Sequence, residues 1–213
     1  MDFNENKEEI RDVDGTDMGK NQGNKQRRLE KNLLYYLHDL CYLLCAVMIL
    51  FLLCFRIVIV SGSSMKSTLV DGDYLLLLSS SIYHNPKQGD IIVASKESFD
   101  NGAPIVKRVI AVAGQEVDID FKTSTVYVDG VALEEDYVFT PTDSSGGVSF
   151  PLTVEEGCLF VMGDNRSNSK DSRYIEIGLI DCREVLGKAF FLFLPGNDKG
   201  YVNRDFSRIG GLY

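Results

Sequence analysis

An apolar run over residues 40–55, which contains no charged side chain, constrains this chain more than any other feature. A helix that spans the hydrocarbon core of a bilayer needs about 20 mostly apolar residues, and the run reaches that length together with the leucine- and tyrosine-rich residues 33–39. Tyr35 would lie in one interfacial zone, and Arg56 could extend its charged end to water at the other. The sequence therefore predicts one N-terminal transmembrane helix, with its exit, over residues 32–60.

Two other structures are compatible with such a run. A helix buried in a soluble core is disfavoured, because the roughly 150 residues that follow could hardly cover it on all sides. A cleaved secretion signal also has a basic flank and an apolar core, but no small-x-small site directly follows this run. Cleavage slightly further along the chain, near residues 61–64, is nevertheless left open as an alternative.

The residues before the run set its predicted orientation. Residues 1–31 are polar and nearly free of large apolar side chains, which predicts a disordered tail. Four cations lie close to the run, and the positive-inside rule then places the tail in the cytoplasm and residues 61–213 outside. These cations are Lys25, Arg27, Arg28 and Lys31.

Residues 61–213 have the length of one domain and a β pattern. Their net charge is −8 of the −9 of the whole chain, which disfavours nucleic acid as a partner. Many short β-branched or alternating runs, separated by glycine turns, predict a mainly β fold with an antiparallel, partly closed sheet. Residues 140–149 are predicted to form a flexible surface loop. The expected strands cover residues 73–78, 90–94, 105–112, 116–121, 125–128, 159–162 and 189–194.

Cysteine and histidine offer little for metal or triad chemistry. Cys158 and Cys182 lie in the β region without a CxxC or Cys/His cluster, so a zinc site is not expected, and whether they pair is left open. A Ser-His-Asp triad would have to use His84, which the Tyr-His-Asn-Pro context indicates is a solvated loop residue. We expect no metal and no organic cofactor.

A serine-rich stretch directly after the apolar run is a candidate nucleophile site. A serine hydroxyl is a weak nucleophile and needs a base, and a lysine can serve when burial lowers its pKa by about 3 units. Lys107 lies in a strand-like run beside Arg108, and neighbouring residues of a strand point to opposite faces, so one can be buried while the other stays wet. The alternative is that both are exposed charges that protect an edge strand, with residues 61–69 a simple linker.

A third segment, residues 160–173, is dense in short polar side chains after a strand. Such residues hydrogen-bond to the local backbone and build rigid turns. Asp171 and Arg173 could form an ion pair, and Ser169 could donate to a neutral lysine amine. A polar turn without a catalytic role is the alternative.

The three segments belong to a longer set of short motifs. These are Ser64-Met65 followed by Thr68-Leu69, Gly89-Asp90-Ile91-Ile92-Val93, Lys107-Arg108-Val109-Ile110 with Gly114, Val126-Tyr127-Val128 with Gly130, Met162-Gly163-Asp164-Asn165-Arg166 with Asn168-Ser169 and Asp171-Ser172-Arg173, and Gly187-Lys188-Ala189. Together they resemble the bacterial type I signal peptidases, which are membrane-anchored serine/lysine endopeptidases. By that resemblance Ser64 would be the nucleophile and Lys107 the general base, Ser169 would orient the lysine amine, and Asp171 and Arg173 would brace the loop.

The resemblance also implies a substrate, a location and an oxyanion site. The substrate would be an exported preprotein whose signal peptide ends in small residues at −1 and −3. The enzyme would lie in the plasma membrane with its catalytic domain outside, an apolar surface against the lipid bilayer and a functional association with the secretion translocon. Gly62, Ser63 and Met65 would flank the oxyanion site. Two positions depart from the usual pattern, since Ser67 replaces a proline and Gly62 replaces the serine of some members, which leaves the backbone N–H of Ser64 as the main oxyanion donor.

Three rival functions remain. Ser63-Ser64-Met65-Lys66 fits the S-x-x-K pattern of penicillin-binding proteins, but the K-T-G sequence that should follow is absent. Self-cleaving repressors of the LexA type share a related Ser/Lys fold but carry a DNA-binding domain in place of an anchor. An anchored β domain for adhesion would keep all its properties after substitution of Ser64 or Lys107.

Overall fold

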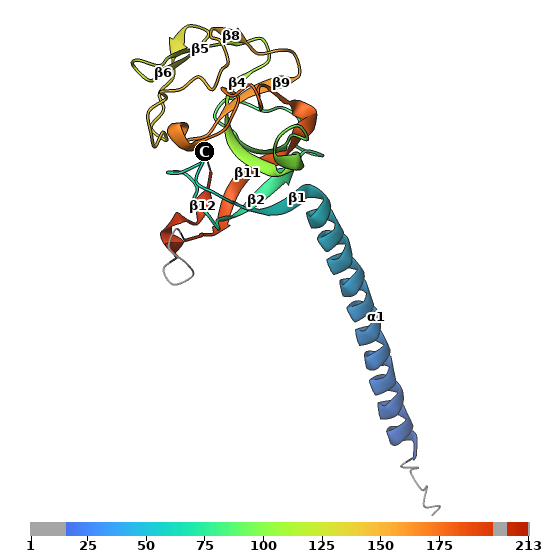
Figure 1. Cartoon of the computed structure of the whole chain (residues 1–213). Helices are drawn as coiled ribbons and strands as arrows, with labels where there is room; N and C mark the ends of the chain where they lie inside the picture. Colours follow the sequence, from blue (N-terminus) through green and yellow to red (C-terminus); the bar gives the residue numbers. More distant parts are fainter. Residues whose placement is uncertain (1–15, 198–203, 213) are drawn as a thin grey trace, which may run out of the picture. The chain divides into compact units, whose positions relative to one another are not determined.

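The computed structural model of the chain describes residues 16–197 and 204–212, and it divides into two compact units, Met1–Leu50 and Phe51–Tyr213 (Figure 1). The first unit contains most of helix α1, Thr16–Cys54. Within α1, Arg28–Cys54 includes an 18-residue window with a mean hydropathy of 2.3, and none of that window is buried. By length and composition it is the one helix in the described part of the chain that could cross a membrane.

The bounds of α1 differ from the expected ones at both ends. Residues 16–31, expected to be disordered, are helical here, since lysine, arginine, glutamine and leucine in this stretch are good helix formers. Residues 1–15 lie outside the described part. The helix ends at Cys54, and Phe55–Ile59 forms strand β1, because the Ile-Val-Ile-Val sequence of residues 57–60 favours extended backbone.

The second unit is mainly β and antiparallel, as the sequence predicts, and its strands form two separate sheets. In the described residues, eight strands form the larger sheet in the order β1-β2-β11-β3-β4-β9-β10, with β12 paired to β11, and four strands form the smaller sheet in the order β7-β6-β5-β8. Figure 1 shows β5, β6 and β8 at one end of this unit and β2, β11 and β12 at the other. The strands are β2 Tyr74–Ser79, β3 Ile91–Ser95, β4 Pro104–Val112, β5 Glu116–Asp120, β6 Thr125–Val128, β7 Val131–Ala132, β8 Leu152–Thr153, β9 Cys158–Met162, β10 Ile180–Asp181, β11 Val185–Leu194 and β12 Gly210–Gly211.

Four short 3₁₀ helices connect these strands in the described residues. They are η1 Asp100–Gly102, η2 Arg166–Asn168, η3 Cys182–Glu184 and η4 Phe206–Arg208. The second of them, η2, lies within the polar segment that the sequence singled out.

The core consists of three apolar clusters on different faces of the sheets. Strand β3 is buried on both faces, because Ile91 and Val93 join one cluster while Ile92 joins another. Strand β9 is also buried on both faces. Its Phe160 packs in the cluster shared with the smaller sheet, and its Leu159 packs in the cluster on the opposite face. This arrangement holds the middle of the larger sheet rigid, and the candidate site is built on β4, which lies between β3 and β9.

Cys158 and Cys182, the two cysteines of the predicted β region, are free thiols that pack against opposite faces of the sheet. Cys158 packs against the cluster shared with the smaller sheet, whereas Cys182 packs against the other face. The segment 140–149, predicted to be a surface loop, contains no strand but is attached to its neighbours. Thr140 forms an isolated parallel β-bridge with Asn165, and the side chain of Thr142 is buried.

Candidate active site

Ser64 and Lys107 meet in the structure as the sequence predicts. Lys107 lies on β4, and its Nζ is 2.8 Å from Ser64 Oγ, within hydrogen-bond distance. The same amine donates to the backbone oxygen of Val106 at 3.0 Å. Lys107 is 4% exposed, so these two oxygens replace much of the water that an exposed ammonium would bind.

Burial has the expected effect on the lysine. Desolvation lowers the pKa of Lys107 from 10.5 to about 8, with a smaller lowering from Arg173. The carboxylates of Asp171 and Asp164 oppose this shift and raise the pKa. At pH 7 an amine with a pKa of about 8 is neutral in about one molecule in ten, which supplies the uncharged form that a general base requires.

Arg108, the neighbour of Lys107 on β4, is also buried. We expected one of the two cations to stay wet, but Arg108 is 2% exposed. Its Nε and one Nη atom donate to the two carboxylate oxygens of Asp164 at 2.9 and 2.8 Å. Its guanidinium lies 3.9 Å from the ring centroid of Tyr137. This paired, stacked geometry is the reason that a second buried cation is tolerated here.

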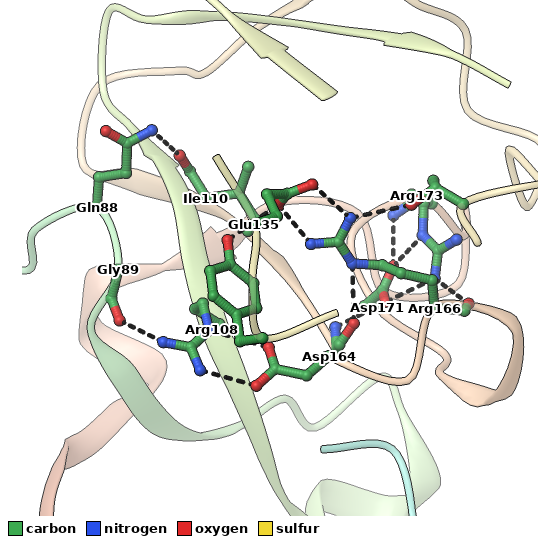
Figure 2. A network of polar contacts seen from close by, with 12 residues as sticks. Gln88, Gly89, Arg108, Ile110, Glu135, Asp164, Arg166, Asp171 and Arg173 are labelled. Carbon is green, nitrogen blue, oxygen red and sulfur yellow. Dashed lines mark hydrogen bonds and ion pairs between the residues drawn. The ribbon is translucent and has the colours of Figure 1, made fainter. Parts of the chain in front are cut away.

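Arg108 is one of three buried arginines in the described residues that pair with a carboxylate, and Figure 2 shows how these side chains lie. The pairs are Arg108–Asp164, Arg166–Glu135 and Arg173–Asp171. Removing one partner of such a pair leaves an uncompensated buried charge and costs about 3–5 kcal/mol. The expected ion pair of Asp171 and Arg173 is present, with both side chains fully buried. These pairs hold the polar segment rigid beside Ser64 and Lys107.

Two asparagines of the polar segment bind the serine turn directly, and the sequence did not single them out. The backbone N–H of Asn165 donates to Ser64 O at 3.0 Å, and its side-chain amide donates to Ser63 O at 3.0 Å. The amide of Asn168 donates to Ser63 Oγ at 2.8 Å. The sequence shows a high density of short polar residues after Gly163. This pattern predicts a rigid turn, but it does not identify the serine turn as the partner of the two asparagines.

Ser169 is the site residue whose predicted contact is missing. It is 5% exposed, and its Oγ has no hydrogen-bond partner in the described residues, so the expected hydrogen bond to Lys107 Nζ is not formed. Its side chain instead packs against Gly163. A Cβ atom added to Gly163 would lie 2.2 Å from Ser169 Oγ and 2.5 Å from Ser64 O, so only glycine fits between them.

The other flanking residues of Ser64 have structural partners. The N–H of Gly62 donates to Asp71 Oδ1 at 2.7 Å and is not available to a substrate. Met65 is 1% exposed in an apolar cluster. The hydroxyl of Ser67, which stands in place of the usual proline, donates to Tyr137 O at 3.0 Å. The serine turn is thus fixed from several directions.

The remaining candidates lie elsewhere. His84 is exposed and lines a pocket with Tyr83 and Arg183, and no bond joins it to Ser64. Within the described residues there is no cluster of three or more His, Cys, Asp or Glu side chains that could hold a metal ion. A serine hydroxyl against a buried lysine amine, on an antiparallel β domain, defines a candidate site of the serine/lysine hydrolase class.

Comparison with known proteins identifies the family. The family model described as signal peptidase, peptidase S26, matches residues 33–194. The chain is 36% identical over 151 residues to a probable signal peptidase I-1 of Synechocystis sp., covering 67% of this chain and 73% of that protein. It is 36% identical over 148 residues to a signal peptidase I of Bacillus licheniformis, covering 66% and 77%.

A solved structure also matches, that of a signal peptidase I from Enterococcus faecalis V583. It is 34% identical, with a TM-score of 0.38, and the match covers 49% of this chain and 96% of that one. The chain belongs to the S26 family of signal peptidases, which are serine endopeptidases.

Proposed function

We propose that this chain removes signal peptides from exported preproteins with Ser64 as the nucleophile and Lys107 as the general base. The observation that carries the proposal is the 2.8 Å separation of Lys107 Nζ and Ser64 Oγ at an amine that is 4% exposed. Burial favours the uncharged amine, and only the uncharged amine can accept a proton from the hydroxyl.

In the acylation half of the reaction, Ser64 Oγ attacks the carbonyl carbon of the scissile bond. Its proton passes to Lys107 Nζ, and the carbonyl π electrons move to the oxygen, which becomes an oxyanion. When the oxyanion collapses, the C–N bond breaks and the lysine ammonium returns the proton to the leaving amine. The products of this half are a Ser64 ester of the signal peptide and a mature protein with a free N-terminus.

In the deacylation half, water replaces the leaving amine. The neutral Lys107 amine accepts a proton from water, whose oxygen attacks the ester carbonyl. The second tetrahedral oxyanion then breaks the bond to Ser64 Oγ, and the lysine returns its proton to the serine. The signal peptide leaves as a carboxylic acid, and the enzyme is restored.

The anchor explains why the substrate would be a membrane-bound preprotein. Helix α1 is long and apolar enough to cross a bilayer, and it ends at Cys54. Nine residues lie between Cys54 and Ser64, and the ten residue-to-residue steps limit their distance to about 33–36 Å. We propose a single-pass plasma-membrane protein with a cytoplasmic N-terminus, acting beside the secretion translocon on cleavage sites with small −1 and −3 residues.

The proposal is tested with the full-length chain in detergent micelles and a preprotein whose cleavage yields a shorter band. Wild type should release the mature protein, while Ser64→Ala and Lys107→Met should each lose roughly 10³-fold or more in rate, the order expected for a missing catalytic group. Lys122→Met, a matched change at an exposed lysine, should cleave like wild type. Full activity in the Ser64 or Lys107 variant would overturn the proposed dyad.

A further inference from the structure

The peptide group between Ser63 and Ser64 is held by two hydrogen bonds to its carbonyl oxygen. The side-chain amide of Asn165 donates to Ser63 O at 3.0 Å, and the backbone N–H of Lys66 donates to the same oxygen at 3.2 Å. The backbone N–H of Asn165 also donates to Ser64 O, the next carbonyl along the chain. Asn165 therefore grips two consecutive carbonyls around the candidate nucleophile.

Fixing this carbonyl also fixes the direction of the Ser64 N–H. A trans peptide is planar, and its N–H points away from its C=O. The Ser63–Ser64 bond is trans, and Ser64 N–H donates to no other group in the described part of the chain. It is an oriented donor next to the reacting hydroxyl, left available for a substrate oxygen.

We infer that Asn165 is a positioning residue that aims the Ser64 N–H at the oxyanion of the tetrahedral intermediate. This inference rests on the proposed Ser64/Lys107 chemistry. The oxyanion site of this chain depends on a well-aimed Ser64 N–H, because Gly62 has no side-chain donor. The N–H of Gly62 is already bound to Asp71. A donor stabilises an oxyanion only when it points at the position that the oxygen will occupy.

The orientation of the Asn165 amide is itself determined by its surroundings. Thr140 Oγ1 accepts from the backbone N–H of Ser167 at 2.9 Å and donates to Asn165 Oδ1 at 3.0 Å. With its oxygen bound in this way, the amide presents its NH₂ group to Ser63 O. Asn165 is 5% exposed, so solvent does not compete strongly for these bonds.

Two kinds of peptide ligand should respond differently when the Ser64 N–H is misaimed. A peptide aldehyde forms a hemiacetal with Ser64, and the former carbonyl oxygen then occupies the oxyanion position. The same peptide with a CH₂–NH group in place of the scissile amide has no carbonyl oxygen and cannot use that position. A misaimed donor should weaken the first ligand and leave the second unchanged.

The experiment measures kcat, KM and both affinities for the full-length chain in detergent micelles, using one signal-site peptide sequence throughout. In Asn165→Asp the group facing Ser63 O can no longer donate. We expect kcat to fall by about 10- to 100-fold with KM within twofold, a loss at or below that of a deleted oxyanion donor. Aldehyde affinity should fall by the same factor, and the CH₂–NH peptide should bind within twofold of wild type.

Two further variants complete the test. Asn101→Asp places the same new charge at an exposed turn and should leave every parameter within twofold of wild type. Thr140→Val leaves Asn165 in place but frees its amide, and it should show a smaller loss of kcat and aldehyde affinity. If Asn165→Asp has no folded melting transition, Thr140→Val decides the question.

The outcomes distinguish this inference from the proposed function. Unchanged kcat and aldehyde affinity in the deciding variant, or an equal loss for both ligands, would overturn the positioning role while Ser64→Ala remains inactive. Activity in Ser64→Ala would instead overturn the proposed function itself.

Discussion

At the scale of single residues, the central feature is a lysine whose burial favours its proposed role as a base and opposes folding. The pKa of Lys107 is lowered from 10.5 to about 8 by desolvation. Because the unfolded chain then binds this proton more tightly than the folded one, the folded state is penalised fully below pH 8. The penalty disappears as the pH rises to 10.5.

Replacing the amine should therefore stabilise the protein. Lys107→Met is expected to raise the free energy of unfolding at pH 7 by about 2 kcal/mol, since 2.5 pKa units correspond to about 3 kcal/mol and a lost hydrogen bond returns about 1. Urea unfolding in detergent, followed by tyrosine fluorescence, measures the difference. The gain should vanish at about pH 10, where the shrinking penalty equals the lost hydrogen bond, and reverse above it. A variant less stable than wild type at pH 7 would contradict the desolvated amine.

The carboxylate of Asp171 tunes this lysine. Asp171 raises the pKa of Lys107, and its partner Arg173 lowers it. In Asp171→Asn the attraction is lost and the arginine charge is uncompensated, so both changes lower the pKa. The ascending limb of kcat/KM should then move to lower pH than in wild type, while exposed Asp118→Asn should leave it in place. A limb that moves to higher pH would show that Asp171 does not act through Lys107.

How far the residues of the site could be predicted depends on where their partners lie in the chain. Ser64 and Lys107 each stand in a short local motif, and the structure brings them together. The burial of Arg108 was not predicted, because its partner Asp164 lies 56 positions away. The hydrogen bond between Asn165 and Ser63 joins residues 102 positions apart, so no local sequence pattern predicts it.

At the scale of elements, the serine turn and the polar segment pack without spare room. Gly163 separates Ser169 from the backbone of Ser64, and an added Cβ atom would lie 2.5 Å from Ser64 O. Contacts under 3.0 Å do not occur for real Cβ atoms, so one of the two segments must move.

Gly163→Ala should consequently displace the nucleophile. A shift of about 1 Å near reacting groups can cost about 10²-fold in rate, and we expect kcat to fall at least roughly tenfold. Steady-state kinetics of peptide cleavage measures this loss. Gly210→Ala is the matched control, because a Cβ atom there meets nothing within 4 Å. Equal rates for the two variants would mean that the packing at Gly163 does not hold Ser64 in place.

The sequence predicts most strands of four or more residues, although β11 begins at Val185 and not at residue 189, and it does not predict the two-residue strands. Strands β4, β5 and β6 follow β-branched or alternating patterns, and their observed bounds agree with the expected ones within about two residues. Strand β1 was read as part of the apolar run because hydropathy does not distinguish a helix from a strand in a short apolar stretch. Strands of two residues, such as β7 and β10, are too short to show any period.

At the scale of the whole molecule, the chain combines an apolar helix with an acidic β domain. The domain's negative charge would repel an anionic lipid surface, so we expect the apolar helix to supply most of the attachment. Full-length protein in vesicles should resist extraction by alkaline carbonate. Met48→Arg, in the middle of α1, adds a cost of about 2.5–3.5 kcal/mol to insertion and should increase the released fraction. Complete release of wild type at alkaline pH would contradict a spanning anchor.

The measurement that tests the account most directly is the titration of the Lys107 amine in the intact chain. Heteronuclear NMR of ¹³Cε- and ¹⁵Nζ-labelled lysine follows this group, and the resonance that is missing from Lys107→Met identifies it. We predict a titration midpoint at about pH 8. A midpoint near 10.4, the ordinary value of a lysine in water, would contradict a neutral amine held beside Ser64.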